Sequence, residues 1–196
     1  VIFSNYNLIE EQKTIFNINC KIVSINDIKN LKRNSVNVLN LSNEEFKIQF
    51  GKSNTSGGNF SRLSLERAVD FLKNSMIDGL VTGPINKNNI QNSDFNYKGH
   101  TDFLDTCFNG EALMFMISSK IKIALLTEHI PINEVVDEIT ADLIKNRIKI
   151  VENSLKLDFQ INKPKIALLS INPHVGDGGI IGKHDDIVLG PTIQQV

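Results

Sequence analysis

The 196-residue sequence contains no tryptophan, two cysteines and five prolines. Cys20 and Cys107 lie far apart and form neither a metal-type pair nor a C-x-x-C motif, so a disulfide framework has no support. No apolar stretch approaches the roughly 20 residues that a membrane-spanning helix needs. The N-terminus also lacks a charged segment followed by a hydrophobic one. These absences, with 41% hydrophobic residues, indicate an ordinary globular protein, which we expect in the cytoplasm.

The sequence also has no large excess of charge of either sign. The 21 basic and 22 acidic residues leave a net charge of −1, so no long-range field favours nucleic acid or an anionic membrane as a partner. Phosphate binding by a local pocket stays open. Because the chain starts at Val1 rather than methionine and stops abruptly at Val196, we expect a piece of a longer protein.

The apolar pattern predicts strands that alternate with helices. Strand-like runs cover residues 1–3, 20–25, 36–41, 45–50, 80–81, 113–117, 121–126 and 166–171. Short helices are expected over 7–16, from Pro84 onward with Pro84 at its start, and after Pro131. A longer helix carries Leu65, Ala68, Val69, Leu72 and Met76 on one face and is capped by Asn59 or Ser61. Another follows Thr140 and carries Ile144, Ile148, Val151 and Leu155. This alternation predicts an α/β fold with a mostly parallel sheet flanked by helices.

A loop over residues 51–58 contains the triplet Gly-Lys-Ser. The Walker pattern places that triplet at the end of a glycine-rich loop that opens a helix, whereas here it begins the loop. The sequence therefore argues against a nucleotide-triphosphate site at this position.

Three predicted strands end in polar triplets. These are Thr82-Gly-Pro84, Thr127-Glu-His129 and Asn172-Pro-His174. The carboxyl ends of parallel strands meet at one edge of a sheet, where ligands bind in open α/β folds. We therefore expect His129 and His174 at the carboxyl edge of neighbouring strands, where two imidazoles can begin a metal site. The alternative for each is a hydrogen-bonded structural histidine.

Two further polar stretches surround this pattern. Gly99-His100-Thr101-Asp102-Phe103 lies at a turn into a helix, where free N–H groups and a hydroxyl can hold a phosphate or carboxylate, although Thr101 can also be a simple N-cap. Glycines at 176, 178, 179 and 182 let the chain turn tightly after His174. His184 follows them among charged residues, and we interpret it as a surface residue.

Taken together, these motifs resemble the 4-hydroxythreonine-4-phosphate dehydrogenase family. The resemblance rests on the order T-G-P-x-x-K, G-H-T-D-F, T-E-H-I-P and N-P-H-x-G-D-G-G, which starts at Thr82, Gly99, Thr127 and Asn172. It is dense from about Ser61 onward and weak over the first 50 residues. It implies an isocitrate/isopropylmalate-dehydrogenase-like fold and a homodimer that works in vitamin B6 biosynthesis with NAD and a divalent metal (Zn, Mg or Co). The implied reaction oxidises and decarboxylates 4-phosphohydroxy-L-threonine to 3-amino-2-oxopropyl phosphate.

By position, His129 and His174 match two of the family's three metal-binding histidines, and His100 with Thr101 match its substrate-contacting pair. The third histidine, and further substrate-binding residues, have no counterpart in this sequence. We therefore expect residues 1–196 to form an incomplete dehydrogenase core that is inactive alone, with subdomain boundaries that the sequence does not assign. Lys87 can donate charge to substrate or be a solvated lysine. No residue is assigned as general acid or base.

Two other functions stay open from the sequence. One is a sister dehydrogenase that acts on another phosphorylated hydroxy acid, such as a phosphothreonate or phosphoerythronate. The other is an inactive fragment that acts only as a binding module.

Overall fold

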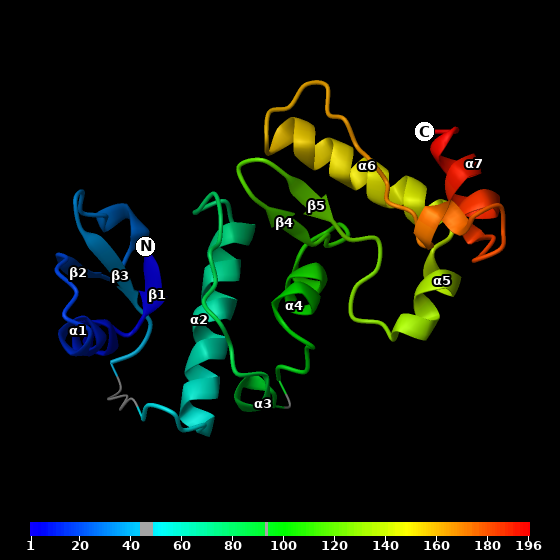
Figure 1. Ribbon diagram of the computed structural model, residues 1–196. Helices are drawn as coiled ribbons and strands as arrows, with labels where there is room; N and C mark the ends of the chain where they lie inside the picture. The colour runs from blue at the N-terminus through cyan, green and yellow to red at the C-terminus, as the bar shows by residue number, and fades with distance from the viewer. Residues whose placement is uncertain (44–48, 93) are drawn as a thin grey trace. The chain divides into compact units, whose positions relative to one another are not determined.

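The computed structural model describes residues 1–43, 49–92 and 94–196 (Figure 1). It divides into two compact units, Val1–Ala112 and Leu113–Val196, called here the N-terminal and C-terminal units. The sequence assigned no such boundary. In the described residues, no helix combines the length and the apolar character that crossing a membrane requires.

A three-stranded parallel sheet opens the N-terminal unit (Figure 1). Its strands are β1 (Ile2–Ser4), β2 (Ile22–Ile25) and β3 (Val36–Asn40), in the order β1-β3-β2. β3 is the central and most buried strand, with Val38 fully buried between its two neighbours. The predicted strands over 1–3, 20–25 and 36–41 are thereby confirmed.

One α-helix and one 3₁₀ turn connect the strands of this sheet. α1 (Tyr6–Ile15) begins where the Asn5 side chain accepts a hydrogen bond from the Leu8 N–H at 3.1 Å, an ordinary N-cap. The 3₁₀ turn η1 (Ile28–Asn30) then leads into β3. The predicted strand over 45–50 falls largely outside the described residues, and Gln49 and Phe50 are not in a strand.

The main helix of this unit, α2 (Thr55–Lys73), starts earlier than predicted. Asn54, not Asn59 or Ser61, is its N-cap, and its side chain accepts from the Gly57 N–H at 2.7 Å. Its apolar face buries Leu65, Ala68 and Val69 as expected, but Met76 lies beyond the helix end and is 43% exposed. Gly58 is required inside the helix, because a Cβ there would overlap the Asn89 carbonyl oxygen.

Two short helices complete the N-terminal unit. α3 (Lys87–Ile90) starts at the Asn86 cap, not at Pro84 as predicted, because the Asn86 side chain accepts from two N–H groups of the first turn. α4 (His100–Cys107) follows. They share with α2 a core of Leu65, Val69, Ile90, Phe95 and Phe103.

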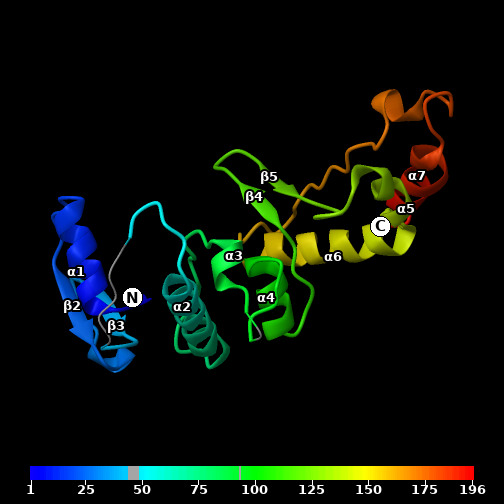
Figure 2. The same ribbon diagram turned by 90° about the horizontal axis from the view of Figure 1, so that it is seen from below.

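The C-terminal unit combines a hairpin with helices. Its elements are β4 (Phe115–Ile117), β5 (Lys122–Ala124), η2 (Ile132–Glu134), α5 (Val135–Glu138), α6 (Ala141–Leu157), η3 (Pro173–Gly176), η4 (Asp185–Leu189, a π-helical turn) and α7 (Gly190–Ile193). β4 and β5 pair antiparallel, so the prediction of parallel strands does not hold for this unit. The hairpin lies beside the C-terminal end of α6 (Figure 2). Phe115 of β4 packs against Phe159, just after α6, with ring centroids 6.1 Å apart.

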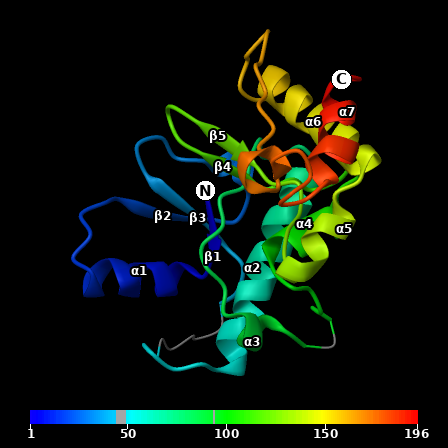
Figure 3. The same cartoon turned by 45° about the vertical axis from the view of Figure 1, so that its right-hand side comes forward.

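α6 is the long helix of the C-terminal unit and agrees with the sequence prediction. The Thr140 hydroxyl accepts from the Leu143 N–H at 3.2 Å and caps it. Ile144 is fully buried against Ile139 and Leu189, so η4 packs on the start of α6. α7 lies beside the same helix (Figure 3), and the Lys145 ammonium donates to the Gln195 side chain at 2.8 Å.

Two predicted strands are wrong in the described structure. Residues 80–81 and 166–171 run without assigned secondary structure, and neither run has a ladder partner in the described part of the chain. Val81 is 97% exposed and Leu169 is 83% exposed. An apolar run becomes a strand only when a neighbour takes its backbone hydrogen bonds, and the sequence pattern alone does not provide that neighbour.

Candidate functional site

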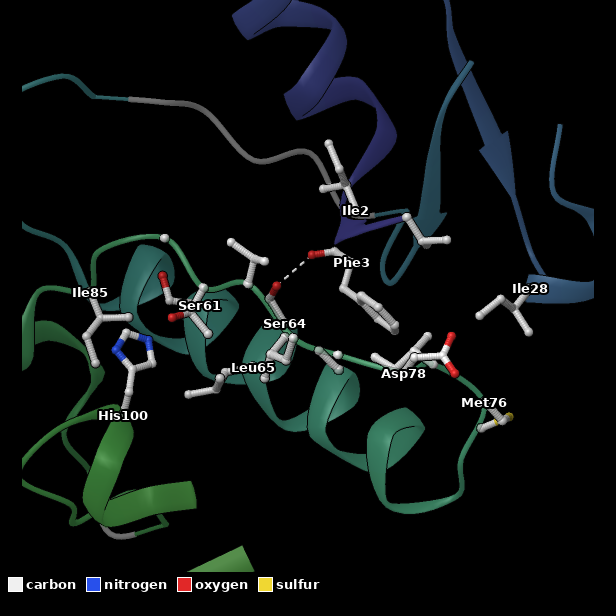
Figure 4. Close-up of a pocket in the computed structure, with 18 of the residues that line it drawn as sticks. Ile2, Phe3, Ile28, Ser61, Ser64, Leu65, Met76, Asp78, Ile85 and His100 are labelled. Carbon is white, nitrogen blue, oxygen red and sulfur yellow. Dashed lines mark hydrogen bonds between the residues drawn. The ribbon is translucent and has the colours of Figure 1, made fainter. Parts of the chain in front are cut away.

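A pocket of about 730 Å³ lies in the N-terminal unit (Figure 4). It is bounded by β1, one face of α2, the segment 76–85 and the first residue of α4. Phe3, Leu65 and Ala68 contribute apolar surface, whereas the polar lining is Ser61, Ser64, Asp78, Thr82 and His100. Small-molecule sites are typically apolar cavities of about 300–1,000 Å³ with a few polar groups, so this pocket has the expected size and character.

α2 supplies the pocket wall through helical spacing. Ser61, Ser64, Leu65 and Ala68 recur at three- and four-residue intervals and therefore share one face. The Ser64 hydroxyl donates to the Phe3 carbonyl at 2.6 Å, the contact drawn in Figure 4. This bond ties α2 to β1 across the pocket.

His100 is the ionisable ring of the pocket. It is the first residue of α4, and its half-buried side chain rises from the helix toward Ile85 and Ser61 (Figure 4). Burial lowers the pKa of the His100 imidazole below its ordinary value of 6.5. The ring is therefore neutral at physiological pH and can both donate and accept a hydrogen bond.

Thr101 follows His100 on α4 but does not line the pocket. The alternative of an N-cap by Thr101 is wrong, because Gly99 occupies the cap position and provides no side-chain bond. The Asp102 carboxylate accepts from the Lys98 N–H at 2.9 Å and stabilises the entry to the helix instead.

Lys87 reaches the start of the same helix. Its Cε and Nζ lie 3.7 and 3.9 Å from the position that a Cβ on Gly99 would occupy. Lys87 is exposed, which agrees with the interpretation of a solvated lysine, and its ammonium lies beside the residue that precedes His100. A contact between Lys87 and the substrate stays a prediction.

The C-terminal unit carries the two histidines predicted to bind metal. His129 follows β5 and His174 lies in η3, and both side chains are exposed. The Glu128 carboxylate accepts from the Met114 N–H at 3.0 Å and anchors the first of these loops to the start of β4. Because the run before His174 is not a strand, the predicted setting at the ends of neighbouring parallel strands is wrong.

Both histidines have a backbone conformation in the left-handed region. His129 has φ 54°, and all six residues from His174 to Gly179 have positive φ. Three of those six are not glycine, and each such residue costs roughly 1–2 kcal/mol. The turn is closed by bonds from the Asp177 N–H to the His174 carbonyl at 3.1 Å and from the Gly179 N–H to the Gly176 carbonyl at 3.0 Å. A segment so strained persists only where its surroundings enforce it.

Asp185, on the C-terminal side of this loop, holds the residues that lead into it. Asp185 is 1% exposed, and its carboxylate accepts from the Ile171 N–H, the Asn172 N–H and the Asn172 side chain. Burial alone would raise the pKa of Asp185, but these hydrogen bonds, with a contribution from the nearby His184, hold it below its ordinary value. The carboxylate is therefore charged at neutral pH.

His184 is not the solvated surface residue that its charged neighbours suggested. Its Nε2 lies 2.6 Å from the Ile139 carbonyl oxygen, so the ring donates to the backbone between α5 and α6. Hydrogen bonding from Nε2–H fixes this histidine as a structural one.

Comparisons with known proteins cover the whole chain, beyond the motifs. A family model described as "Pyridoxal phosphate biosynthetic protein PdxA" matches residues 1–196. The chain belongs to this family.

Two curated relatives from different organisms share a name. A "4-hydroxythreonine-4-phosphate dehydrogenase" of Bacteroides thetaiotaomicron is 32% identical over all of this chain and 54% of that protein. A protein of the same name from Sulfurihydrogenibium is 33% identical over 99% of this chain and 60% of that protein. The chain thus spans roughly half to three fifths of the length of these relatives.

A solved structure supports the fold. The crystal structure of a 4-hydroxythreonine-4-phosphate dehydrogenase from Burkholderia phymatum matches with a TM-score of 0.83 at 22% identity, over 100% of this chain and 60% of that chain. The α/β fold expected from the sequence is therefore that of the PdxA family.

The PdxA family resemblance implies a metal, and the residues present fit it in part. Both candidate imidazoles are exposed and neither makes a hydrogen bond within the described residues, so both are available as ligands. No group of three or more histidine, cysteine, aspartate or glutamate side chains gathers anywhere in the described ranges. His129 and His174 are thus an incomplete ligand set, and their sharing of one metal stays a prediction.

Sequence reasoning missed two kinds of residue in this PdxA-family chain. Ser64 and Asp78 line the pocket, and the spacing of Ser61 and Ser64 on an otherwise apolar helix face was a usable signal. Asp185 had no such signal, because its neighbours His184 and Asp186 make the stretch look like a charged surface.

Proposed function

We propose that this chain forms the substrate pocket and part of the metal site of a 4-hydroxythreonine-4-phosphate dehydrogenase. The proposed reaction is the NAD- and metal-dependent oxidation and decarboxylation of 4-phosphohydroxy-L-threonine in vitamin B6 biosynthesis. One observation carries the proposal: Thr82 of the T-G-P-x-x-K motif and His100 of the G-H-T-D-F motif line the same pocket. The homodimer and the cytoplasmic location stay predictions.

The roles of the pocket residues follow from their chemistry. The neutral His100 imidazole can donate a hydrogen bond to an anionic oxygen of the substrate or accept one from its hydroxyl or amine. The Lys87 ammonium beside Gly99 adds a positive charge near the start of α4, where free N–H groups also favour an anion. Apolar residues such as Leu65 keep water away from the bound substrate.

His129 and His174 would hold the metal, which would supply a lower pKa of the substrate alcohol, and NAD would supply the hydride acceptor. Imidazole ligands suit zinc or cobalt better than magnesium. No residue of this chain is assigned to NAD.

A binding experiment tests the pocket. Calorimetric titration of the 196-residue chain with 4-phosphohydroxy-L-threonine should show saturable binding, and His100→Ala should weaken it by roughly tenfold or more, because a hydrogen bond to a charged group is lost. The same titration of Thr101→Ala tests the substrate role that the family resemblance implies for Thr101, which does not line this pocket. Thr106→Ala is the matched control on α4, since the Thr106 hydroxyl bonds to its own helix at the Asp102 carbonyl.

The results separate the alternatives. Unchanged affinity in His100→Ala would remove the substrate role of this residue. Tighter binding of a phosphothreonate or phosphoerythronate than of 4-phosphohydroxy-L-threonine would identify a sister dehydrogenase instead.

We also expect no turnover from these 196 residues alone. A catalytic metal site of this type needs about three protein ligands, and the described residues offer two candidate imidazoles. A second copy of the same chain lacks the same ligand, so homodimer formation does not restore it. The measurement is the formation of reduced cofactor with NAD, substrate and added Zn²⁺ or Co²⁺. Steady turnover would show that the ligand set is complete within this chain.

A further inference from the structure

The buried carboxylate of Asp185 belongs to the first residue of η4, just after the loop that carries His174, yet the proposed reaction gives it no role. It is one of the least exposed side chains in the described structure, at 1%. No lysine or arginine pairs with it in the described residues. A buried charge of this kind is retained only where hydrogen bonds compensate its lost hydration.

The hydrogen bonds to this carboxylate come from the two residues that lead into the turn. Asp185 Oδ1 accepts from the Ile171 N–H at 2.8 Å. Oδ2 accepts from the Asn172 N–H at 3.0 Å and from the Asn172 Nδ2 at 2.8 Å. Since Ile171 and Asn172 have no strand partner in the described part of the chain, the carboxylate replaces the neighbouring strand that would otherwise hold them.

Close packing leaves this arrangement little freedom. A Cβ on Gly182 would stand 2.7–2.9 Å from the Asn172 side-chain atoms, and a Cβ on Gly176 would stand 2.2 Å from the Gly182 carbonyl oxygen. The two ends of the loop are therefore in contact on both sides of His174. Only Pro173 separates the fixed residue Asn172 from His174, and the proline ring restricts the backbone there.

We propose that Asp185 is a positioning residue: by fixing the backbone of Ile171 and Asn172, its carboxylate sets where His174 is presented. The purpose of that position rests on the proposed function, in which His174 binds the metal. The left-handed backbone at His174 supports the assignment, because residues in sparsely populated conformations need a surrounding structure that holds them.

The experiment uses the ¹⁵N-labelled 196-residue chain and two groups of variants. Asp185→Asn keeps the shape of the side chain but turns an acceptor into a donor facing Asn172. Asn172→Ala is milder, because it removes one of the three hydrogen bonds and leaves the carboxylate in place. Asp186→Asn is the matched control, since it makes the same change in charge at the exposed neighbouring residue.

Two readouts are made without metal and one with it. We expect Asp185→Asn to speed amide hydrogen exchange at Ile171 and Asn172 by at least about tenfold, since bonds to a charged acceptor are lost. The ring signals of His174 should also move. In a Zn²⁺ titration followed by the His129 and His174 ring signals, the dissociation constant should rise roughly tenfold or more, as for residues that orient a metal ligand. Asn172→Ala should show smaller shifts of the same kind, and Asp186→Asn none.

A role in stability alone would lower the melting temperature without moving the His174 signals or the Zn²⁺ dissociation constant of the folded variants, and that result would overturn the proposal. If Asp185→Asn does not fold, the same outcomes are read from Asn172→Ala. His174→Ala is the reference for the metal. If the unsubstituted chain binds no Zn²⁺ at His174, the metal part of the proposed function fails, whereas the metal-free readouts still decide whether Asp185 positions His174.

Discussion

The two units present their candidate residues on different kinds of backbone. In the N-terminal unit, His100 begins a regular helix, and positive φ among non-glycine residues falls on Asn17, Asn34 and Ser75. In the C-terminal unit, positive φ falls on His129, His174, Val175, Asp177 and Gln160. Asparagine accepts this conformation readily, whereas valine does not. The pocket thus follows from ordinary helix and strand geometry, while the histidine loop requires specific residues elsewhere to hold it.

The largest effect should come from removing the Asp185 carboxylate. Asp185→Ala leaves three half-buried donors without their acceptor, so we expect a loss of about 3 kcal/mol in the free energy of unfolding, measured with urea. Asp186→Ala should change it by less than about 0.5 kcal/mol. A small loss in Asp185→Ala would show that the loop does not depend on its buried charge.

The same carboxylate should make stability depend on acid pH. The folded-state pKa of Asp185 lies below the ordinary value of 3.8, so its stabilisation is complete above that pH. It is lost as the pH falls through the lower folded-state value. The difference in unfolding free energy between the unsubstituted chain and Asp185→Asn should therefore narrow in that acid range, and a constant difference would contradict this assignment.

Gly182→Ala should have the next largest effect. The added methyl overlaps the Asn172 side chain, so we expect a loss of about 1–3 kcal/mol by the same urea measurement. Gly83→Ala, in the N-terminal unit, is the control because a Cβ there meets nothing within 4 Å. Equal losses in the two variants would mean that the loop is no more tightly packed than the segment that borders the pocket.

Val175→Gly should stabilise the C-terminal unit by about 0.5–1 kcal/mol. Glycine relieves the left-handed strain of roughly 1–2 kcal/mol but loses more conformational entropy on folding. Val175 is 56% exposed, so little buried surface is lost. Val136→Gly, on α5 with its side chain 39% exposed, should instead destabilise by about 1 kcal/mol. The melting temperature should therefore rise in Val175→Gly and fall in Val136→Gly.

The smallest effect concerns His100. Its NMR titration midpoint should lie below 6.5, because burial in the pocket disfavours the charged ring. Ile85→Ala opens the pocket beside this ring and should move the midpoint back toward 6.5. A midpoint at or above 6.5 in the unsubstituted chain would show that the ring is hydrated.

The sequence predicted those features that depend on local pattern. The apolar run of β3, the Thr140 cap of α6 and the position of His100 at the start of a helix are all confirmed. The start of α2 was missed because the sequence Ser56-Gly57-Gly58 is typical of a loop. In the structure these residues are helical, and Gly58 must lack a side chain because Asn89 packs closely against it. The pattern of apolar residues does not show which distant segments pair with each other. The segment before His174 was therefore wrongly predicted as a strand, and the burial of Asp185 was not predicted.

The aromatic cluster beside the pocket has an optical consequence. Tyr97 packs edge-on against Phe95 and Phe103, with ring centroids 4.9 and 5.2 Å away. The sequence has no tryptophan, and both of its tyrosines, Tyr6 and Tyr97, belong to the N-terminal unit. Tyrosine fluorescence and near-ultraviolet circular dichroism in the tyrosine band therefore follow the N-terminal unit alone. Phe159→Trp, beside β4, would give the C-terminal unit a tryptophan signal of its own, so the unfolding of each unit could be followed separately in one chain.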